Sequence, residues 1–132
     1  MRQGNNSNKD FFIIIVFRWI KVVADSMYKN GPDGLSGNDD CGQMSAWYIW
    51  SSLGMYPMNP ASGAYVFGVP LIRKAIIQLP NNKQLIIEVK KFKSANTKGI
   101  VSVQLNGKPM PIKSVTHQQL LSGGKLVFTV AE

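Results

Sequence analysis

Residues 40–54 read DCGQMSAWYIWSSLG, and this stretch carries the clearest structural signal in the chain. Asp40 followed three residues later by Gln43 is a capping-box pattern, which marks the start of a helix, and Gly54 is a helix stop. The residues between them are apolar on nearly every side of the predicted helix. The apolar residues are Met44, Ala46, Trp47, Tyr48, Ile49, Trp50 and Leu53. Because a surface helix carries only one apolar stripe, this pattern predicts a helix buried on most sides in an assembly larger than the chain.

A second helical pattern lies upstream, over residues 18–29. Its apolar side chains fall on one helical stripe, and the sequence Asn-Gly-Pro at 30–32 ends it. The β-branched run at 13–16 is either a strand or the front of the same helix. Residues 1–17 begin with a polar, Asn-rich stretch that matches no obvious element, so we treat them as a separate segment that could be disordered.

The pattern changes to short β-type runs after residue 64. Turn signals at 80–82, 106–107 and 123–124 separate these runs. The expected strands are residues 65–67, 74–79, 84–89, 100–105 and 125–130. We therefore predict an antiparallel β region, with the proline-containing loop 56–64 as the boundary between the helical and the β part.

Composition and charge are those of one folded domain. The chain has 132 residues, 45% of them apolar, and a formal charge of +8. All of the excess positive charge lies in residues 70–132, which hold ten basic and two acidic side chains. The lysines are spread over predicted strands and turns without arginine clustering, which favours a solvated sheet face over a nucleic-acid site.

Neither a membrane span nor a signal peptide is expected. The apolar run 11–17 is far shorter than the roughly 20 residues that cross a bilayer, and Arg18 and Lys21 stand where a signal peptide would have small residues at its cleavage site. The single cysteine, Cys41, excludes an internal disulfide and a multi-cysteine zinc site. It has no activating partner in the sequence, so we expect a small packing residue. No compartment follows from these features.

Three aspartates on a glycine-rich loop form the one constellation that could carry chemistry. Asp33, Asp39 and Asp40 fall within eight positions, interleaved with glycines. The dipole of the helix that follows would keep such carboxylates ionised, and an ionised carboxylate can act as a general base or bind a hard cation. The alternative is structural: Asp40 as a helix cap and Asp33 as a turn former. Spacing alone leaves both open.

Two other kinds of site fit poorly. An EF-hand needs a glutamate at the twelfth loop position, but the twelfth residue counted from Asp33 is Met44. His117 is the only histidine and stands in a polar stretch of the β region, where we expect an exposed loop residue.

The acidic loop closely resembles a family signature. Residues 32–48, PDGLSGNDDCGQMSAWY, are similar to the signature near the end of the catalytic domain in glycoside hydrolase family 92. The segments LGMYPMNP at 53–60 and YVFGVPL at 65–71 resemble the family's next segments, and VQLNGK at 103–108 and SGGKLVF at 122–128 its closing strands. The resemblance covers about Ile20 to Val130. Residues 1–17 match nothing in the family, which suggests a truncated or misjoined reading frame.

The resemblance implies a calcium-dependent, inverting exo-α-mannosidase. Members combine an N-terminal β-sandwich with a C-terminal (α/α)6 barrel domain, and many are secreted or periplasmic. The implied fold is α+β and partial: the last barrel helices and the active-site loop in residues 18–64, then the antiparallel β region in 65–132. The implied substrate is an α-mannoside or a high-mannose N-glycan with α-1,2 bonds. The implied partner is the missing N-terminal part of the same enzyme, not a nucleic acid or a membrane.

The resemblance also implies roles for single residues. An inverting glycosidase needs a protonated acid and an ionised base on opposite faces of the sugar. Asp39 and Asp40 would supply the base side, with Asp40 as the base, and Asn38 and Asp33 would contact the substrate. Asn38 departs from the acid-x-acid triplet of many members.

The rest of the catalytic machinery is expected outside this chain. The general acid, a glutamate, and most calcium ligands lie upstream in the family, and neither Glu88 nor Glu132 is a candidate acid. Asp40 would approach the calcium ion through water at most, so the chain forms no metal site by itself. We therefore expect a fragment that is inactive alone.

Two alternatives stay open. A carbohydrate-binding or interaction module would use the lysine-bearing β region with the aromatic residues Trp47, Tyr48, Trp50 and Tyr65, although the helix aromatics sit at core spacing. A nucleic-acid-binding protein would use the basic half, and its affinity would fall steeply with salt.

Overall fold

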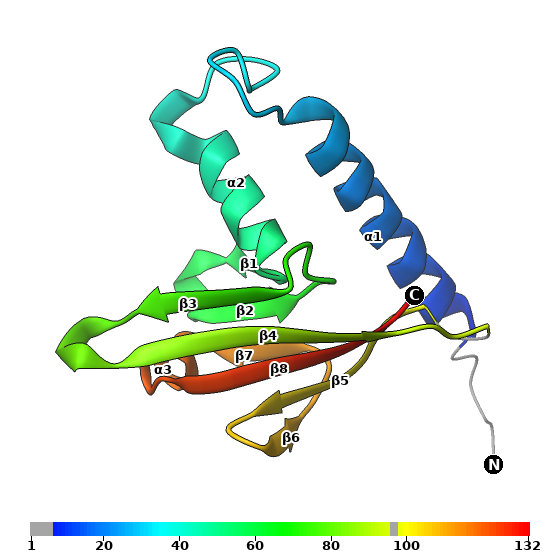
Figure 1. Cartoon of the computed structure of the whole chain (residues 1–132), viewed down its shortest axis with the longest axis vertical. Helices are drawn as coiled ribbons and strands as arrows, with labels where there is room; N and C mark the ends of the chain where they lie inside the picture. Colours follow the sequence, from blue (N-terminus) through cyan, green and yellow to red (C-terminus); the bar gives the residue numbers. More distant parts are fainter. Residues whose placement is uncertain (1–6, 96–97) are drawn as a thin grey trace. The chain divides into compact units, whose positions relative to one another are not determined.

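The structure is a computed structural model that describes residues 7–95 and 98–132 (Figure 1). Its contacts divide the chain into two compact units. One unit ends at Ser45 and the other is Ala46–Glu132. Each is described by itself. None of the helices in the described ranges combines the length and apolar character needed to cross a membrane.

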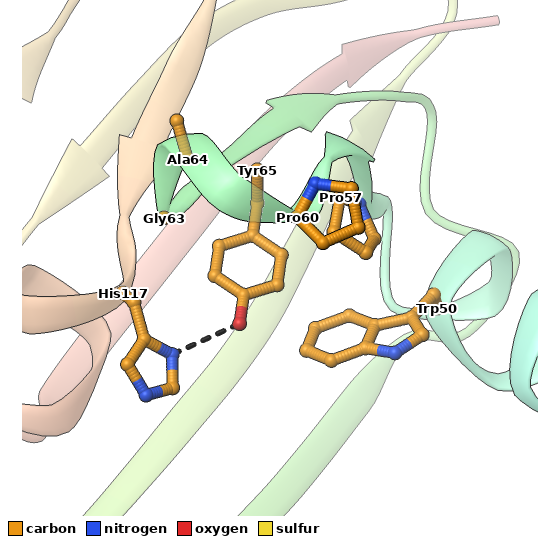
Figure 2. Close-up of a pocket in the computed structure, with 7 residues that line it drawn as sticks. All are labelled: Trp50, Pro57, Pro60, Gly63, Ala64, Tyr65 and His117. Carbon is orange, nitrogen blue, oxygen red and sulfur yellow. Dashed lines mark hydrogen bonds between the residues drawn. The ribbon is translucent and has the colours of Figure 1, made fainter.

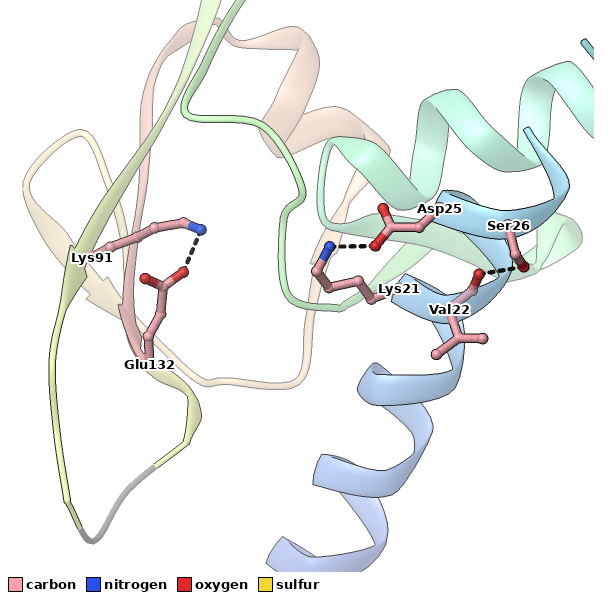
Figure 3. A network of polar contacts seen from close by, with 6 residues as sticks. All are labelled: Lys21, Val22, Asp25, Ser26, Lys91 and Glu132. Carbon is pink, nitrogen blue, oxygen red and sulfur yellow. Dashed lines mark hydrogen bonds and ion pairs between the residues drawn. The ribbon is translucent and has the colours of Figure 1, made fainter. Parts of the chain in front are cut away.

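The first unit begins with one continuous helix, α1 (Ser7–Met27). The β-branched run 13–16 is therefore the front of this helix and not a strand, and residues 7–17 are helical where we considered disorder. Residues 1–6 of that segment lie outside the described part. Near the end of α1, Lys21 pairs with Asp25 and the Ser26 hydroxyl donates to the Val22 carbonyl oxygen (Figure 3). Both contacts join residues one helical turn apart.

A loop then leads to a single 3-10 turn, η1 (Asp40–Gly42), and to helix α2 (Gln43–Ser52). Within the chain, the side chains of Tyr48 and Ile49 on α2 are 39% and 57% exposed, and Trp47 and Trp50 are half-buried. The chain thus does not itself supply the burial that the composition of α2 predicts.

The second unit holds two β-sheets. The smaller sheet is antiparallel, in the order β1 (Met55–Asn59), β2 (Ala64–Phe67) and β7 (Ser114–Thr116). The larger sheet has the order β3 (Lys74–Gln78), β4 (Gln84–Phe92), β8 (Gly124–Ala131), β5 (Gly99–Leu105) and β6 (Lys108–Met110). Three short helices connect strands: η2 (Pro60–Ser62), η3 (Pro80–Asn82) and α3 (His117–Leu121).

The five expected strands correspond to β2, β3, β4, β5 and β8, and the structure corrects two features of the prediction. The β part begins at Met55, because β1 occupies residues 56–59 of the loop that we predicted at 56–64. The prediction of a purely antiparallel region is wrong for β4 and β8, which pair in parallel. The chain leaves β4, passes through four further elements and returns between β4 and β5 in the same direction as β4.

The core of the second unit lies between its two sheets. Alternate residues of β4 point inward, namely Leu85, Ile87 and Val89, as expected for a strand with one solvated face. Phe128 of β8 is fully buried and meets Phe67 of β2 edge-on, with ring centroids 5.4 Å apart and planes at 90°. This aromatic pair therefore joins the larger sheet to the smaller one.

Candidate active-site loop and aromatic pocket

The first part of the loop that carries the aspartates, residues 28–35, forms a closed turn around Asp33. The Lys29 amide donates to the Gly34 carbonyl oxygen at 2.8 Å, and Tyr28 and Leu35 form an isolated antiparallel bridge. A Cβ at Gly34 would collide with the Lys29 carbonyl oxygen and lie 2.9 Å from that of Gly31. Only glycine fits the tight turn after Asp33.

The Asp39 carboxylate caps helix α2. One oxygen accepts the backbone amides of Met44 at 2.8 Å and Ser45 at 3.2 Å, and the other accepts the Ser45 hydroxyl. The amides belong to the first turn of α2, where backbone donors have no partner inside the helix. The Ser45 hydroxyl first, then the two amides, lower the pKa of Asp39 against the opposing effect of partial burial.

The expected cap at Asp40 is wrong. Cys41 and Gly42 have left-handed backbone angles, with φ of 55° and 73°, and this turn separates Asp40 from the helix that starts at Gln43. The Asp40–Gln43 capping box therefore does not form, and Asp39 takes the role. Cys41 is exposed, so the expected packing role is wrong as well.

The Asp40 side chain points to solvent. Within residues 7–95 and 98–132 it makes no hydrogen bond or ion pair, and the same holds for the exposed side chains of Asn38 and Asp33. The two adjacent aspartates thus differ: the oxygens of Asp39 are occupied by the helix, and those of Asp40 are available to a substrate, a water molecule or a cation.

Tyr28 ties the end of α1 to the first turn of α2. Its hydroxyl donates to the Met44 carbonyl oxygen at 2.9 Å. Burial first, and then the negative charge of Asp39, raise the pKa of Tyr28, so the phenol keeps its proton and the hydrogen bond. Sequence reasoning assigned Tyr28 only to the apolar stripe of the helix.

Side chains that commonly bind metal ions are not clustered in the described part of the chain. No three side chains of His, Cys, Asp or Glu in this part of the chain lie close enough together to hold a metal ion. Both carboxylate oxygens of Asp39 already accept hydrogen bonds, so Asp40 is the free carboxylate of the adjacent pair. One carboxylate supplies at most two of the six to eight oxygen ligands that Ca²⁺ takes.

A pocket of about 350 Å³ lies in the second unit (Figure 2). Its lining residues are Trp50, Pro57, Pro60, Gly63, Ala64, Tyr65 and His117. The rings of Trp50 and Tyr65 stack with centroids 4.8 Å apart, and the Tyr65 hydroxyl is hydrogen-bonded to Nδ1 of His117 at 2.9 Å. The pocket therefore combines an aromatic stack with one polar pair.

His117 is placed differently from its expected position in a loop. It is the first residue of α3, and Thr116 and Gln119 cap this helix in a full capping box. The His117 amide also donates to the Gly63 carbonyl oxygen at 2.7 Å. The pattern Thr-x-x-Gln at 116–119 is a capping-box signature and could have indicated this helix from the sequence.

Most of the chain matches one known family of proteins. The sequence model of the glycosyl hydrolase family 92 catalytic domain matches residues 17–132. The chain belongs to this family. The match includes both the aspartate loop between α1 and α2 and the whole β region, so both belong to the same family domain.

Solved structures of family 92 enzymes share the fold. An α-mannosidase of the family from Bacteroides thetaiotaomicron is 34% identical, with a TM-score of 0.74 over 86% of this chain. The same enzyme in complex with mannoimidazole gives 31% identity and a TM-score of 0.77 over 91%. An inverting mannosidase of the same organism gives 32% and 0.70 over 86%. These neighbours have mixed helices and antiparallel strands as this chain does.

A curated relative is an uncharacterized secreted glycosidase of Arthroderma benhamiae, 27% identical over 109 residues, which are 81% of this chain. The chain spans 14% of that relative's length and 15% or 16% of the length of the three solved structures.

Proposed function

We propose that this chain provides the general-base side of an inverting exo-α-mannosidase, with Asp40 as the base. The observation that carries the proposal is the contrast between two adjacent carboxylates. Asp39 is committed to the start of α2, whereas Asp40 is exposed and makes no bond within the described residues. A general base must be ionised and within reach of a water molecule, and of the two only Asp40 has free oxygens.

In this mechanism Asp40 removes a proton from the water that attacks the anomeric carbon, on the face opposite the leaving group. Asn38 and Asp33 precede it on the same loop, and their free amide and carboxylate groups would hydrogen-bond sugar hydroxyls. Asp39 would act indirectly, by holding the loop against α2.

We place the general acid in a part of the longer enzyme outside this chain, because neither glutamate of the chain fits the role. The acid has to be protonated at working pH, which requires a raised pKa. Hydrogen bonding to Lys125 lowers the pKa of Glu88, and hydrogen bonding to Lys91 lowers that of Glu132. Both glutamates are therefore ionised, and we propose that the chain alone is inactive.

The proposed substrate is an α-mannoside, with the α-1,2 bonds of high-mannose N-glycans as the linkage. Support for an α-mannoside comes from the relatives, among them the family 92 α-mannosidase solved with mannoimidazole. We propose that the enzyme uses a calcium ion whose ligands lie mostly in the remainder of the longer protein, because the described residues supply too few.

A chimeric enzyme tests the proposal. Residues 17–132 would replace the matching segment of the Bacteroides thetaiotaomicron α-mannosidase, and Asp40→Asn would be compared with the unmodified chimera. Loss of a general base lowers kcat by about 10²–10⁴-fold. Asp25→Asn, on the exposed face of α1, is the matched control and should keep full activity.

The leaving group identifies which half of the acid–base pair is lost. An aryl mannoside with a very acidic phenol does not need a general acid, but it still needs the base. The Asp40→Asn defect should therefore persist with this substrate. Recovery of the rate, or calcium-dependent turnover by the 132-residue chain alone, would contradict the proposal.

A further inference from the structure

The aromatic pocket of the second unit is held in place by its backbone. Trp50 comes from α2 and Pro57 from β1, Tyr65 is paired with Val115 across β2 and β7, and His117 opens α3. The amide of His117 is bonded to Gly63. Because the lining residues belong to or adjoin α2, β1, η2, β2 and α3, which are all hydrogen-bonded elements, the pocket is formed before any ligand arrives.

The lining is mostly apolar, with one imidazole at its polar end. It contains no Asp, Glu, Lys or Arg side chain, so it favours an uncharged ligand. In Figure 2 the His117 imidazole lies at one end of the row, the Tyr65 ring next to it, and the two proline rings and Trp50 beyond. A ligand would meet apolar surfaces along most of the pocket and a polar group at one end.

The polar end accepts either kind of hydrogen-bonding partner. Nδ1 of His117 is engaged by the Tyr65 hydroxyl. If Nδ1 accepts that hydrogen, Nε2 carries the proton and donates; if Nδ1 donates, Nε2 accepts. A sugar hydroxyl both donates and accepts, so it matches both tautomers.

We propose that this pocket binds one pyranose ring of a neutral mannoside. The C–H face of the ring would lie on the aromatic and proline side chains, where polarised hydrogens meet the negative faces of the π-systems, and a ring hydroxyl would bond Nε2 of His117. A volume near 350 Å³ is at the small end of ligand sites and fits a ligand of this size. The choice of mannose rests on the proposed function.

The competing occupant is a proline-rich peptide, which also docks on aromatic grooves. It is less well matched, because a proline ring has no hydrogen-bond donor and only the peptide carbonyl could meet Nε2. It would use one tautomer of His117, whereas a sugar uses both.

Titration of the 132-residue chain with methyl α-D-mannopyranoside, followed by nuclear magnetic resonance, tests the proposal. We expect millimolar affinity and shifts of the Trp50 indole and His117 ring signals. His117→Ala should weaken binding about tenfold, as expected for one lost hydrogen bond. Tyr65→Phe, which removes only the hydroxyl that orients the imidazole, should weaken it by a smaller factor.

Gln118→Ala is the matched control, because Gln118 is the next exposed residue of α3 and does not line the pocket. It should bind as the unmodified chain does, and circular dichroism should show that all three variants are folded. Absence of binding at tens of millimolar, binding that His117→Ala and Tyr65→Phe leave unchanged, or binding of a decaproline peptide in place of the mannoside would overturn the proposal.

The two proposals fail separately. Asp40→Asn should leave mannoside binding by the chain unchanged, since Asp40 does not line the pocket. If the chain binds the mannoside at the pocket but the chimera is inactive, the proposed function alone is rejected. If the chimera is active but the 132-residue chain does not bind the mannoside, this inference alone is rejected.

Discussion

Asp39 and Asp40 are adjacent in the sequence but differ in chemical environment. The ionised form of Asp39 accepts three hydrogen bonds, from two backbone amides and one hydroxyl, and its pKa is lowered. A group whose pKa is lower in the folded than in the unfolded chain stabilises the fold above its unfolded pKa. That stabilisation is lost as the pH falls through the lower, folded value.

Asp39→Ala should therefore lower the thermal midpoint by a few degrees at neutral pH, because α2 loses its cap. The difference from the unmodified chain should shrink once the pH falls below 3.8, the ordinary pKa of an aspartate, towards the folded pKa. Circular dichroism melts over this range measure it. Asp33→Ala, also on the loop but without a bond in the described part, is the control and should melt normally. An equal deficit in strong acid would show that Asp39 acts by packing and not by charge.

At this scale the sequence identified the loop but not the roles inside it. Residue types pointed to Asp40 as the cap because Gln43 stands three positions later. The left-handed turn at Cys41 prevents Asp40 from capping the helix. Cysteine rarely adopts positive φ, so the residue types did not indicate this turn. The aspartate that caps from further upstream could be found only in three dimensions.

Among the elements, α2 and β1 are joined at a point where only glycine fits. Gly54 has a φ of 76°, and its carbonyl oxygen accepts the Gly68 amide at 2.9 Å. A Cβ here would lie 2.5 Å from the Pro70 ring and 2.8 Å from the Gly68 carbonyl oxygen. The cost of the strained backbone and the cost of the steric collision are added together. Gly54→Ala should therefore lower the free energy of unfolding by about 2–4 kcal/mol.

Gly63→Ala separates the two causes. Gly63 also has a positive φ, 61°, but nothing lies within 4 Å of the position of its Cβ. Only the backbone cost of about 1–2 kcal/mol should remain. Urea unfolding at equilibrium compares the two variants, and similar losses in both would mean that the Pro70 and Gly68 contacts relax without cost.

The elements also show where periodicity stops being informative. The five strands of four or more residues with β-type composition were predicted, but β6 and β7 have only three residues each, too few to show alternation. The parallel pairing of β4 with β8 depends on residues some 40 positions apart along the chain and leaves no local signal. Local sequence predicts strands, and long-range packing decides their order.

On the scale of the whole molecule, the contact between the two sheets of the second unit should govern its cooperativity. Phe128 is fully buried and bridges them through Phe67. Phe128→Ala should cost about 3–5 kcal/mol and destabilise both sheets together. Ile76→Ala on β3, where the side chain is 54% exposed, should cost about 0.5 kcal/mol or less. Hydrogen exchange that collapses in only one sheet of Phe128→Ala would show that the sheets fold independently.

Charge is the other whole-molecule property, and it is concentrated in the β region. Residues 70–132 hold ten basic side chains and two acidic ones. Both acids are in ion pairs, Glu88 with Lys125 at 2.6 Å and Glu132 with Lys91 (Figure 3). Lys90 and Lys74 also lower the pKa of Glu88, after the Lys125 contact. Each glutamate therefore offsets repulsion among several cations, an effect that one exposed pair alone would hardly provide.

Glu88→Gln should consequently lower the thermal midpoint at low ionic strength, because three lysines lose their shared counter-charge. The deficit should fade near 1 M salt, where the Debye length shrinks to about 3 Å. The deficit in thermal midpoint should also shrink below pH 4.5, the ordinary pKa of a glutamate, and vanish as the pH passes through the lower pKa of Glu88 in the folded chain. Under these conditions the unmodified chain loses the same negative charge. Asp25→Asn breaks the isolated Lys21 pair of α1 and should show a smaller dependence on salt. A Glu88→Gln deficit that persists unchanged in high salt would instead assign the role of Glu88 to packing on the sheet, and the excess of lysines would then be a solvated face without consequence for stability.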